Sequence, residues 1–199
     1  YEKKLLRRIF TIRAYEGDYP KSIIEEGKSL EELEEIQSNL NSLERKGHII
    51  YNEYIETYHP FLCKEFLQMA MERKELSVDT VKIYFEEYSK NMENFVNLLR
   101  VGTNISIEKN LDLMSISVEF LEKAVKVSKK EREKAGALNN LGVALSDWAK
   151  LIKGEEPEEA RKKYERAIEC FDKALEINPN DPKDILLNNK GNIVYIGKI

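Results

Sequence analysis

The chain has 199 residues, of which 42% are hydrophobic and 34% are charged, and it contains 9 glycines and 5 prolines. This apolar content excludes a disordered chain, and the scarcity of helix breakers favours long helices. The formal net charge is -4, and the excess of acidic residues lies within residues 1–100. This distribution argues against a protein that binds nucleic acid mainly through its phosphates.

Nothing in the sequence indicates a membrane-bound or exported protein. No apolar run approaches the roughly 18 residues that a transmembrane helix needs, and no signal peptide is visible. The two cysteines, Cys63 and Cys170, lie far apart in helical patterns, where buried and reduced thiols are the usual finding. We therefore expect a cytoplasmic protein that makes no contact with a membrane.

Residues 1–60 predict three helices followed by a β-hairpin. The first helix is expected at residues 4–14, a turn at residues 17–20, and a short second helix from Ser22. The third follows an apolar stripe with spacings of three and four residues, formed by Leu33, Ile36, Leu40 and Leu43.

The end of the third helix and the hairpin have their own local signals. Lys46-Gly47 supplies a cation near the last carbonyls and a glycine that can end a helix. The stretch HIIYNEYIETY is rich in β-branched and aromatic residues, which favours a hairpin. Three helices and a hairpin in this order, and the stretch LEEIQSNLNSLERKGHII in particular, resemble a winged helix-turn-helix. The resemblance implies a winged-helix domain over residues 1–60.

From residue 61 onward the sequence predicts only helices. Apolar stripes predict them over residues 61–73, 81–99, 107–125 and 138–152. A fifth helix is expected to open at Pro157, because proline suits the first helical turn. Asp181-Pro182 then caps and starts a sixth helix.

Two of these helices carry the same motif, Asn-Asn-x-Gly, once at residues 139–142 and again at residues 188–191. The helix after the first copy supplies small, aromatic and small residues and then a proline: Ala167, Phe171, Ala174 and Pro179. Helix pairs with this pattern characterise the tetratricopeptide repeat, and the chain resembles that family over roughly residues 80–199. The resemblance implies a mainly α fold, in which a winged helix-turn-helix precedes an α-α superhelix of tetratricopeptide-like hairpins over residues 61–199. In both copies the glycine is expected to allow close packing of helices.

The sequence departs from the family in three places. The helix pair before the first motif, which supplies Phe120, Leu121, Ala124 and Val127, lacks the terminal proline. Between Gly142 and Ala167 it carries about 13 residues more than the family does, so we expect longer helices or an extended turn there. Lys190 stands where the family prefers leucine. A helical-hairpin array of another type is the alternative interpretation.

The tetratricopeptide resemblance also implies a binding groove, because the first helix of each pair lines a concave surface in that family. Carried over by register, it predicts six groove residues: Asn139, Val143, Ser146, Asn188, Asn192 and Tyr195. Asparagine side chains in this groove can hydrogen-bond to a peptide backbone, so a protein or peptide partner is expected. The other interpretation is that these residues are exposed polar side chains without a ligand.

No set of residues predicts catalysis, a cofactor or a metal site. Gly27-Lys28-Ser29 resembles the end of a phosphate-binding loop, but Ser22 stands where that loop needs a glycine. His59 and Cys63 are spaced for one helix face, yet two ligands are too few to hold zinc. We therefore predict a protein that is not an enzyme and needs no cofactor.

The residues after the predicted hairpin suggest a larger architecture. The stretch ETYHPFLCKEFLQMAMERKE, with His59, Pro60 and Phe61, resembles the segment that joins winged helix and helical repeats in signalling ATPases of the STAND class. That resemblance implies an ATPase domain upstream. The chain starts at Tyr1 rather than Met and stops within a repeat, so we expect a portion of a longer protein.

Two functions are consistent with these patterns. The first is a protein-interaction and regulatory module, in which the repeats bind a protein or peptide and the winged helix acts as a docking domain. The alternative is a transcription regulator that reads DNA with residues 1–60. Acidic residues crowd the start of the third helix, the end that would face the bases and phosphates: Glu31, Glu32, Glu34 and Glu35. They favour the first function, and nucleic acid is not expected as a partner.

Overall fold

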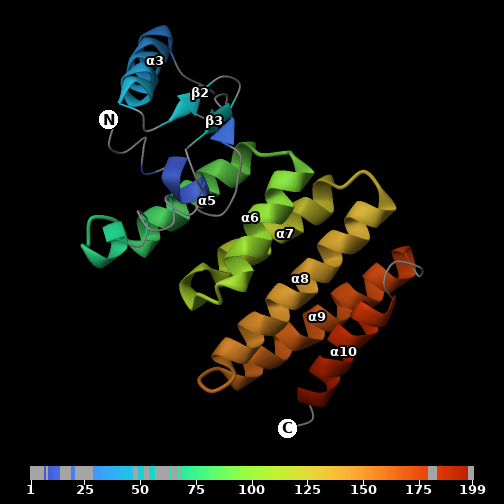
Figure 1. Cartoon of the computed structure of the whole chain (residues 1–199). Helices are drawn as coiled ribbons and strands as arrows, with labels where there is room; N and C mark the ends of the chain where they lie inside the picture. The colour runs from blue at the N-terminus through green and yellow to red at the C-terminus, as the bar shows by residue number, and fades with distance from the viewer. Residues whose placement is uncertain are drawn as a thin grey trace. The chain divides into compact units, whose positions relative to one another are not determined.

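The computed structural model describes residues 7, 9–13, 19–20, 29–46, 49–51, 54–56, 63, 67, 69–178 and 183–196 (Figure 1). The described part is mainly helical. The chain forms two compact units, Tyr1–Met92 and Glu93–Ile199. The boundary predicted after residue 60 falls among residues outside the described part and stays a prediction.

In the first unit the clearest element is helix α3, Leu30–Arg45. Ser29 and Glu32 form a capping box: the Ser29 backbone N–H donates to the Glu32 carboxylate at 2.8 Å, and the Glu32 N–H donates to the Ser29 hydroxyl at 3.3 Å. Three of the four residues in the predicted stripe, Ile36, Leu40 and Leu43, are buried. The periodicity of the sequence thus identified both the helix and its core face.

A small antiparallel sheet belongs to the same unit. It consists of β1 (Tyr19–Pro20), β2 (Ile50–Tyr51) and β3 (Tyr54–Glu56), in the order β1-β3-β2. β2 and β3 lie within the stretch for which a hairpin was predicted. Tyr19 and Pro20 were predicted to be part of a turn, but they form β1. The strand lies at an edge of the sheet, where the missing N–H of proline is tolerated.

Helix α5, Val78–Asn91, completes the described part of this unit. Ser77 caps its start, and the helix buries Val81, Phe85 and Tyr88 almost completely. Among the residues of the predicted first helix, Ile9 and Ile12 are fully buried. The side chain of Arg7 forms an ion pair with Glu75 at 2.7 Å between Nη2 and Oε2.

The second unit is a series of helices, each packed against the next in the chain (Figure 1). They are α6 (Phe95–Ile107), the short 3₁₀ helix η1 (Leu111–Leu113), α7 (Met114–Val127), α8 (Glu131–Ile152), α9 (Pro157–Ile177) and α10 (Lys183–Ile196). α8 also contacts α6 and α10. The pairs α6/α7 and α8/α9 are therefore helical hairpins that follow one another.

Three helix boundaries differ from the prediction. One is the start of α8, which lies at Glu131 rather than at residue 138. The helix expected over residues 81–99 is interrupted, because Met92 is extended and the Asn94 side chain accepts a hydrogen bond from the Asn97 N–H and starts α6. The helix expected over residues 107–125 begins only at Met114. Before it, Lys109 takes a φ of 51° and Asn110 caps η1.

The extra residues of the α8/α9 pair are accommodated by long helices. α8 has 22 residues and α9 has 21, and only residues 153–156 join them. Pro157 occupies the first turn of α9, as expected. Cys63 and Cys170 are both free and buried, which confirms the prediction for the thiols. None of the described helices combines the length and apolar character required to cross a bilayer.

Candidate functional site

The α8/α9 pair is built around a contact between Gly142 and Phe171. A Cβ atom added at Gly142 would lie 2.6 Å from Cε1 of the Phe171 ring. Phe171 is almost completely buried, so its ring has no space to move away. The close-packing role predicted for Gly142 is confirmed, since any larger residue would separate the two helices.

The α6/α7 pair repeats this design. The sequence predicted a repeat here from Leu121 and Ala124 of α7, but its glycine, Gly102, was not predicted. A Cβ atom added at Gly102 would lie 2.8 Å from Cγ of Leu121. The buried hydroxyl of Ser117 donates to the Gly102 carbonyl at 2.7 Å, which joins the two helices at the same point. Ser117, Leu121 and Ala124 have the same four-then-three spacing as the small, aromatic and small residues of α9.

A chain of side-chain hydrogen bonds connects the first helices of the pairs, α6, α8 and α10. The Asn189 amide donates to the Asn139 oxygen at 3.1 Å, the Asn139 amide donates to the Asn140 oxygen at 3.3 Å, and the Asn140 amide donates to the Thr103 hydroxyl at 3.1 Å. All four side chains are partly buried. We call this set the amide chain. It includes both asparagines of the first motif and the second asparagine, Asn189, of the other motif.

The predicted groove residues of α8 are largely engaged within the protein. Asn139 belongs to the amide chain, and Val143 packs half-buried against the hydrophobic core. Ser146 is only 6% exposed. These three positions face neighbouring helices more than solvent.

The predicted groove residues of α10 differ from those of α8. Asn188 and Asn192 are exposed. Tyr195 lies in α10, but its side chain is outside the described part. The resemblance to the family predicted Asn188 as a groove residue. The side chain of α10 that contacts α8 is instead that of Asn189. The groove itself stays a prediction.

Gly191 departs from the packing role predicted for it. It is exposed, and none of the described residues lies within 4 Å of a Cβ atom added there. The two copies of the motif thus differ in the described structure: Gly142 is covered by an aromatic ring, and Gly191 is open.

Two ion pairs also connect helices of the second unit. Arg166 of α9 pairs with Glu122 of α7. Lys190 of α10 pairs with Asp172 of α9. The Lys190–Asp172 ion pair explains why a lysine can stand where the family prefers leucine, because the ammonium group has an acidic partner on the neighbouring helix.

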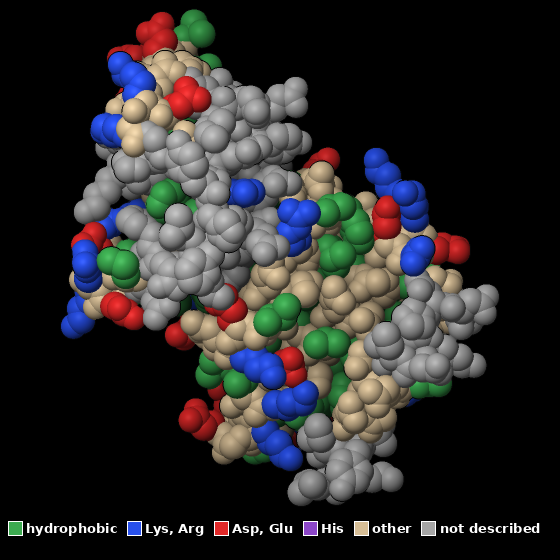
Figure 2. Space-filling view, viewed as in Figure 1, with side chains coloured by type: hydrophobic (Ala, Val, Ile, Leu, Met, Phe, Trp, Pro, Cys, Tyr) green, Lys and Arg blue, Asp and Glu red, His purple; other side chains and the backbone are tan. Residues whose placement is uncertain are grey.

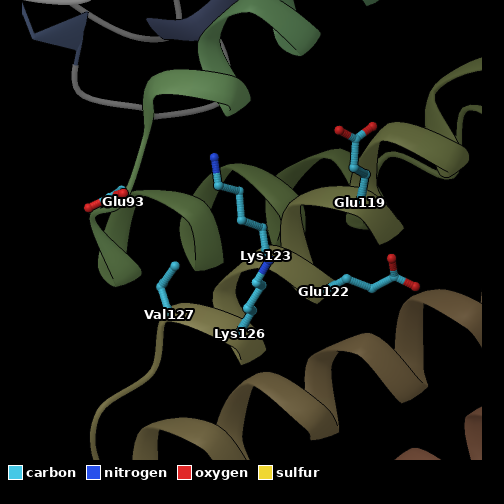
Figure 3. Close-up of a pocket in the computed structure, with 6 residues that line it drawn as sticks. All are labelled: Glu93, Glu119, Glu122, Lys123, Lys126 and Val127. Atoms are coloured by element: carbon cyan, nitrogen blue, oxygen red, sulfur yellow. The ribbon is translucent and has the colours of Figure 1, made fainter.

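One shallow pocket of about 390 Å³ lies along α7, and its lining includes Glu93, Glu119, Lys123 and Lys126. Figure 3 shows the Lys123 side chain rising between those of Glu93 and Glu119. Partial burial lowers the pKa of Lys123, and the two carboxylates oppose that shift. The charges that line the pocket are mixed, because glutamates and lysines lie side by side in it. Among the described residues, no group of three or more His, Cys, Asp or Glu is placed to hold a metal ion.

The surface of the helical unit in view is chemically mixed. Figure 2 shows small hydrophobic areas separated by polar atoms, with lysines and arginines at the edges. No single large apolar area dominates this face.

Comparison with known families identifies one segment. Residues 159–181 match the family model of the tetratricopeptide repeat. The match begins in the first turn of α9 and includes Ala167, Phe171 and Ala174, whereas α8 and the α6/α7 pair lie outside it. No curated protein and no solved structure matches the chain. The second helix of the α8/α9 pair is thus similar to that of a tetratricopeptide repeat.

Proposed function

We propose that this chain is a protein-interaction module that binds an extended peptide segment of a partner along its first helices, α6, α8 and α10. The amide chain carries the proposal, because it places uncharged donors and acceptors in a row across all three helices. Such a row suits the N–H and C=O groups of a peptide backbone. The tetratricopeptide match at residues 159–181 supports the same class of function.

The amide chain retains hydrogen-bonding capacity for a partner. An asparagine side chain has two N–H donors and an oxygen with two lone pairs. Asn139 uses one donor and one lone pair within the amide chain. Next to it, Asn188 and Asn192 are exposed on α10. These two are the side chains that we expect to make the first contact with a peptide.

For residues 1–60 we propose intramolecular docking rather than DNA reading. The described residues include a helix, α3, that leads into the β2/β3 hairpin, which fits the winged-helix resemblance. The first turns of α3 expose Glu31, Glu34 and Glu35, and these carboxylates would oppose a phosphate backbone. An upstream ATPase domain, the absence of catalysis and the cytoplasmic location stay predictions.

Selection of displayed random peptides against the full chain tests the groove. Enriched peptides, measured by fluorescence anisotropy, should bind the chain and lose at least about fivefold in affinity to an Asn188→Ala/Asn192→Ala variant. The matched control is Asn41→Ala, which removes an exposed helical asparagine in the other unit. It should leave the affinity unchanged.

Two results would contradict this function. One is a selection from which no peptide is enriched. The other is a set of peptides that bind the Asn188→Ala/Asn192→Ala variant as tightly as the unaltered chain, because their site would then lie elsewhere.

A further inference from the structure

Gly136 lies inside the 22-residue helix α8 but packs against none of the described residues. No described residue lies within 4 Å of a Cβ atom added at Gly136, whereas Gly142 in the same helix is covered by the Phe171 ring. A glycine in a helix interior destabilises the helix relative to alanine. At Gly142 a close contact between helices offsets this cost. At Gly136 no contact among the described residues does so.

Gly136 shares one face of α8 with a cation and with a member of the amide chain. Arg132, Gly136, Asn139 and Val143 are spaced four, three and four residues apart, which places them on one side of the helix. Arg132 and Gly136 are exposed, whereas Asn139 and Val143 are partly buried. The accessible part of this face therefore lies at Arg132 and Gly136, about one turn before the amide chain begins.

The accessible part belongs to a helix in the middle of the second unit. α8 contacts α6 and α7, which precede it in the chain, and α9 and α10, which follow it. The space over Gly136 is thus open on a helix against which four described helices already pack. A peptide that lies across α6, α8 and α10 has to cross this helix.

The residues at the start of α8 are strongly basic. Residues 123–134 include six lysines or arginines and two glutamates, although the whole chain has a net charge of -4. One of these glutamates, Glu133, is paired with Lys130 at 3.4 Å between Oε1 and Nζ. Figure 2 shows lysine and arginine side chains gathered at the end of the unit where α7 joins α8. Five exposed cations form what we call the basic patch: Lys126, Lys129, Lys130, Arg132 and Lys134.

We propose that the peptide bound along the first helices is acidic and crosses α8 at Gly136, with its carboxylates against the basic patch. The inference rests on the proposed function and adds to it the charge of the ligand and its point of closest approach. Because Gly136 has no Cβ atom, the backbone of a ligand can contact the helix backbone there directly. Asn139, about one turn later, then supplies hydrogen bonds to the N–H and C=O groups of the ligand.

A broad polyanion fits this surface less well than a narrow peptide. Glu119 and Glu122 line the pocket along α7 together with Lys126 of the basic patch. Glu131 is exposed within the patch itself. A duplex nucleic acid or an anionic membrane would bring phosphates against these carboxylates as well as against the cations. An extended peptide can contact the cations and avoid the carboxylates.

Peptides enriched by selection on the full chain are the probe. We expect them to be rich in Asp and Glu and to bind more weakly as salt is raised. In fluorescence anisotropy, Gly136→Leu should bind them at least about tenfold more weakly, because the leucine side chain occupies the space of the ligand backbone. Arg132→Gln should bind them about fivefold more weakly. Circular dichroism and urea unfolding will verify that Gly136→Leu folds, as the open space at Gly136 implies.

The matched controls are Gly154→Leu and Arg161→Gln. Gly154 is an exposed glycine between α8 and α9, and no described residue lies within 4 Å of a Cβ atom added there. Arg161 is an exposed arginine of α9. Both variants should leave the peptide affinity within about twofold.

The Asn188→Ala/Asn192→Ala variant separates this inference from the proposed function. If that variant weakens peptide binding but Gly136→Leu does not, the groove stands and the crossing at Gly136 is overturned. Enriched peptides that lack acidic residues, or that bind equally at low and high salt, overturn the acidic ligand. A selection that enriches no peptide overturns both proposals. Salt-sensitive binding to duplex DNA or to phosphatidylserine vesicles that Arg132→Gln abolishes also overturns the inference, because the patch would then serve a polyanion.

Discussion

The side-chain amide of Asn189 donates a hydrogen bond of 3.1 Å to the side-chain oxygen of Asn139, 50 residues earlier in the chain. The neighbouring Asn140 reaches in the opposite direction, to Thr103 of α6. The two asparagines of the first motif therefore connect α8 to both adjacent first helices. Both asparagines of the first motif and the second asparagine of the other motif thus have partners on neighbouring helices.

The Asn139–Asn189 bond should be measurable as a coupling energy. Asn189→Ala and Asn139→Ala should each destabilise the chain by about 1 kcal/mol, and the double variant should lose less than the sum by about 0.5–1.5 kcal/mol. Urea unfolding followed by circular dichroism provides the three values. Asn188→Ala is the control, because Asn188 is exposed, and it should change stability by less than about 0.5 kcal/mol. Full additivity of Asn139→Ala and Asn189→Ala would show that the bond does not form.

Two glycines of α8 should respond to alanine in opposite directions. Gly142→Ala forces a Cβ atom against the Phe171 ring, so we expect a loss of about 1–3 kcal/mol in the free energy of unfolding. Gly136→Ala meets nothing within 4 Å and should stabilise the chain by roughly 0.5–1 kcal/mol through helix propensity. Chemical unfolding of both variants is the measurement. A Gly142→Ala variant as stable as the unaltered chain would mean that α8 and α9 lie farther apart at Gly142 than this contact with Phe171 implies.

Tyr164→Phe should not weaken the chain at neutral pH. The Tyr164 hydroxyl is buried and has no hydrogen-bond partner among the described residues. Its removal should be neutral or should stabilise the chain by up to about 1 kcal/mol. A loss larger than about 1 kcal/mol would show that the hydroxyl makes a strong bond in solution.

The same residue should affect stability at alkaline pH. Burial, and then the charge of Asp147, raise the pKa of Tyr164 above its ordinary value of 10.0. The folded state therefore favours the protonated phenol. This contribution is fully present below pH 10.0 and is lost at higher pH, where the unfolded chain ionises first. Urea unfolding at about pH 7 and about pH 10.5 should show a smaller alkaline loss for Tyr164→Phe than for the unaltered chain.

The chain should not bind random duplex DNA, even at low salt. The exposed carboxylates of α3, Glu34 and Glu35 among them, repel phosphates without releasing counterions. Fluorescence anisotropy with labelled duplex should show no change, whereas a Glu34→Lys/Glu35→Lys variant should gain salt-sensitive binding. Tight binding by the unaltered chain that weakens steeply with salt would instead support the transcription-regulator alternative.

Apolar periodicity was the most reliable guide to the fold. It identified α3 and its buried stripe, and it located α8 and α9. It failed at the interruption between α5 and α6, because Tyr88, Met92, Phe95 and Leu99 continue one stripe across the break. The start of α6 is set by Asn94, whose side chain caps the helix. The spacing of apolar residues contains no information about such a capping residue.

The candidate site was less predictable than the fold. Sequence comparison between the two Asn-Asn motifs found Gly142, but Gly102 has no such motif before it and was missed. The asparagine that joins α10 to α8 is Asn189 rather than Asn188. Which of two adjacent side chains reaches a neighbouring helix depends on how the helices are rotated about their axes, and periodicity does not determine that angle.

The packing of each helix in the second unit against its neighbours in the chain has a consequence for how that unit folds. Contacts that are local in sequence cost little loop entropy, so folding should be fast and should spread from one hairpin to the next. The long α8/α9 pair is the natural nucleus. In hydrogen exchange, the backbone amides of α8 and α9 should be the last to exchange, because these two helices make the most extensive contact in the unit.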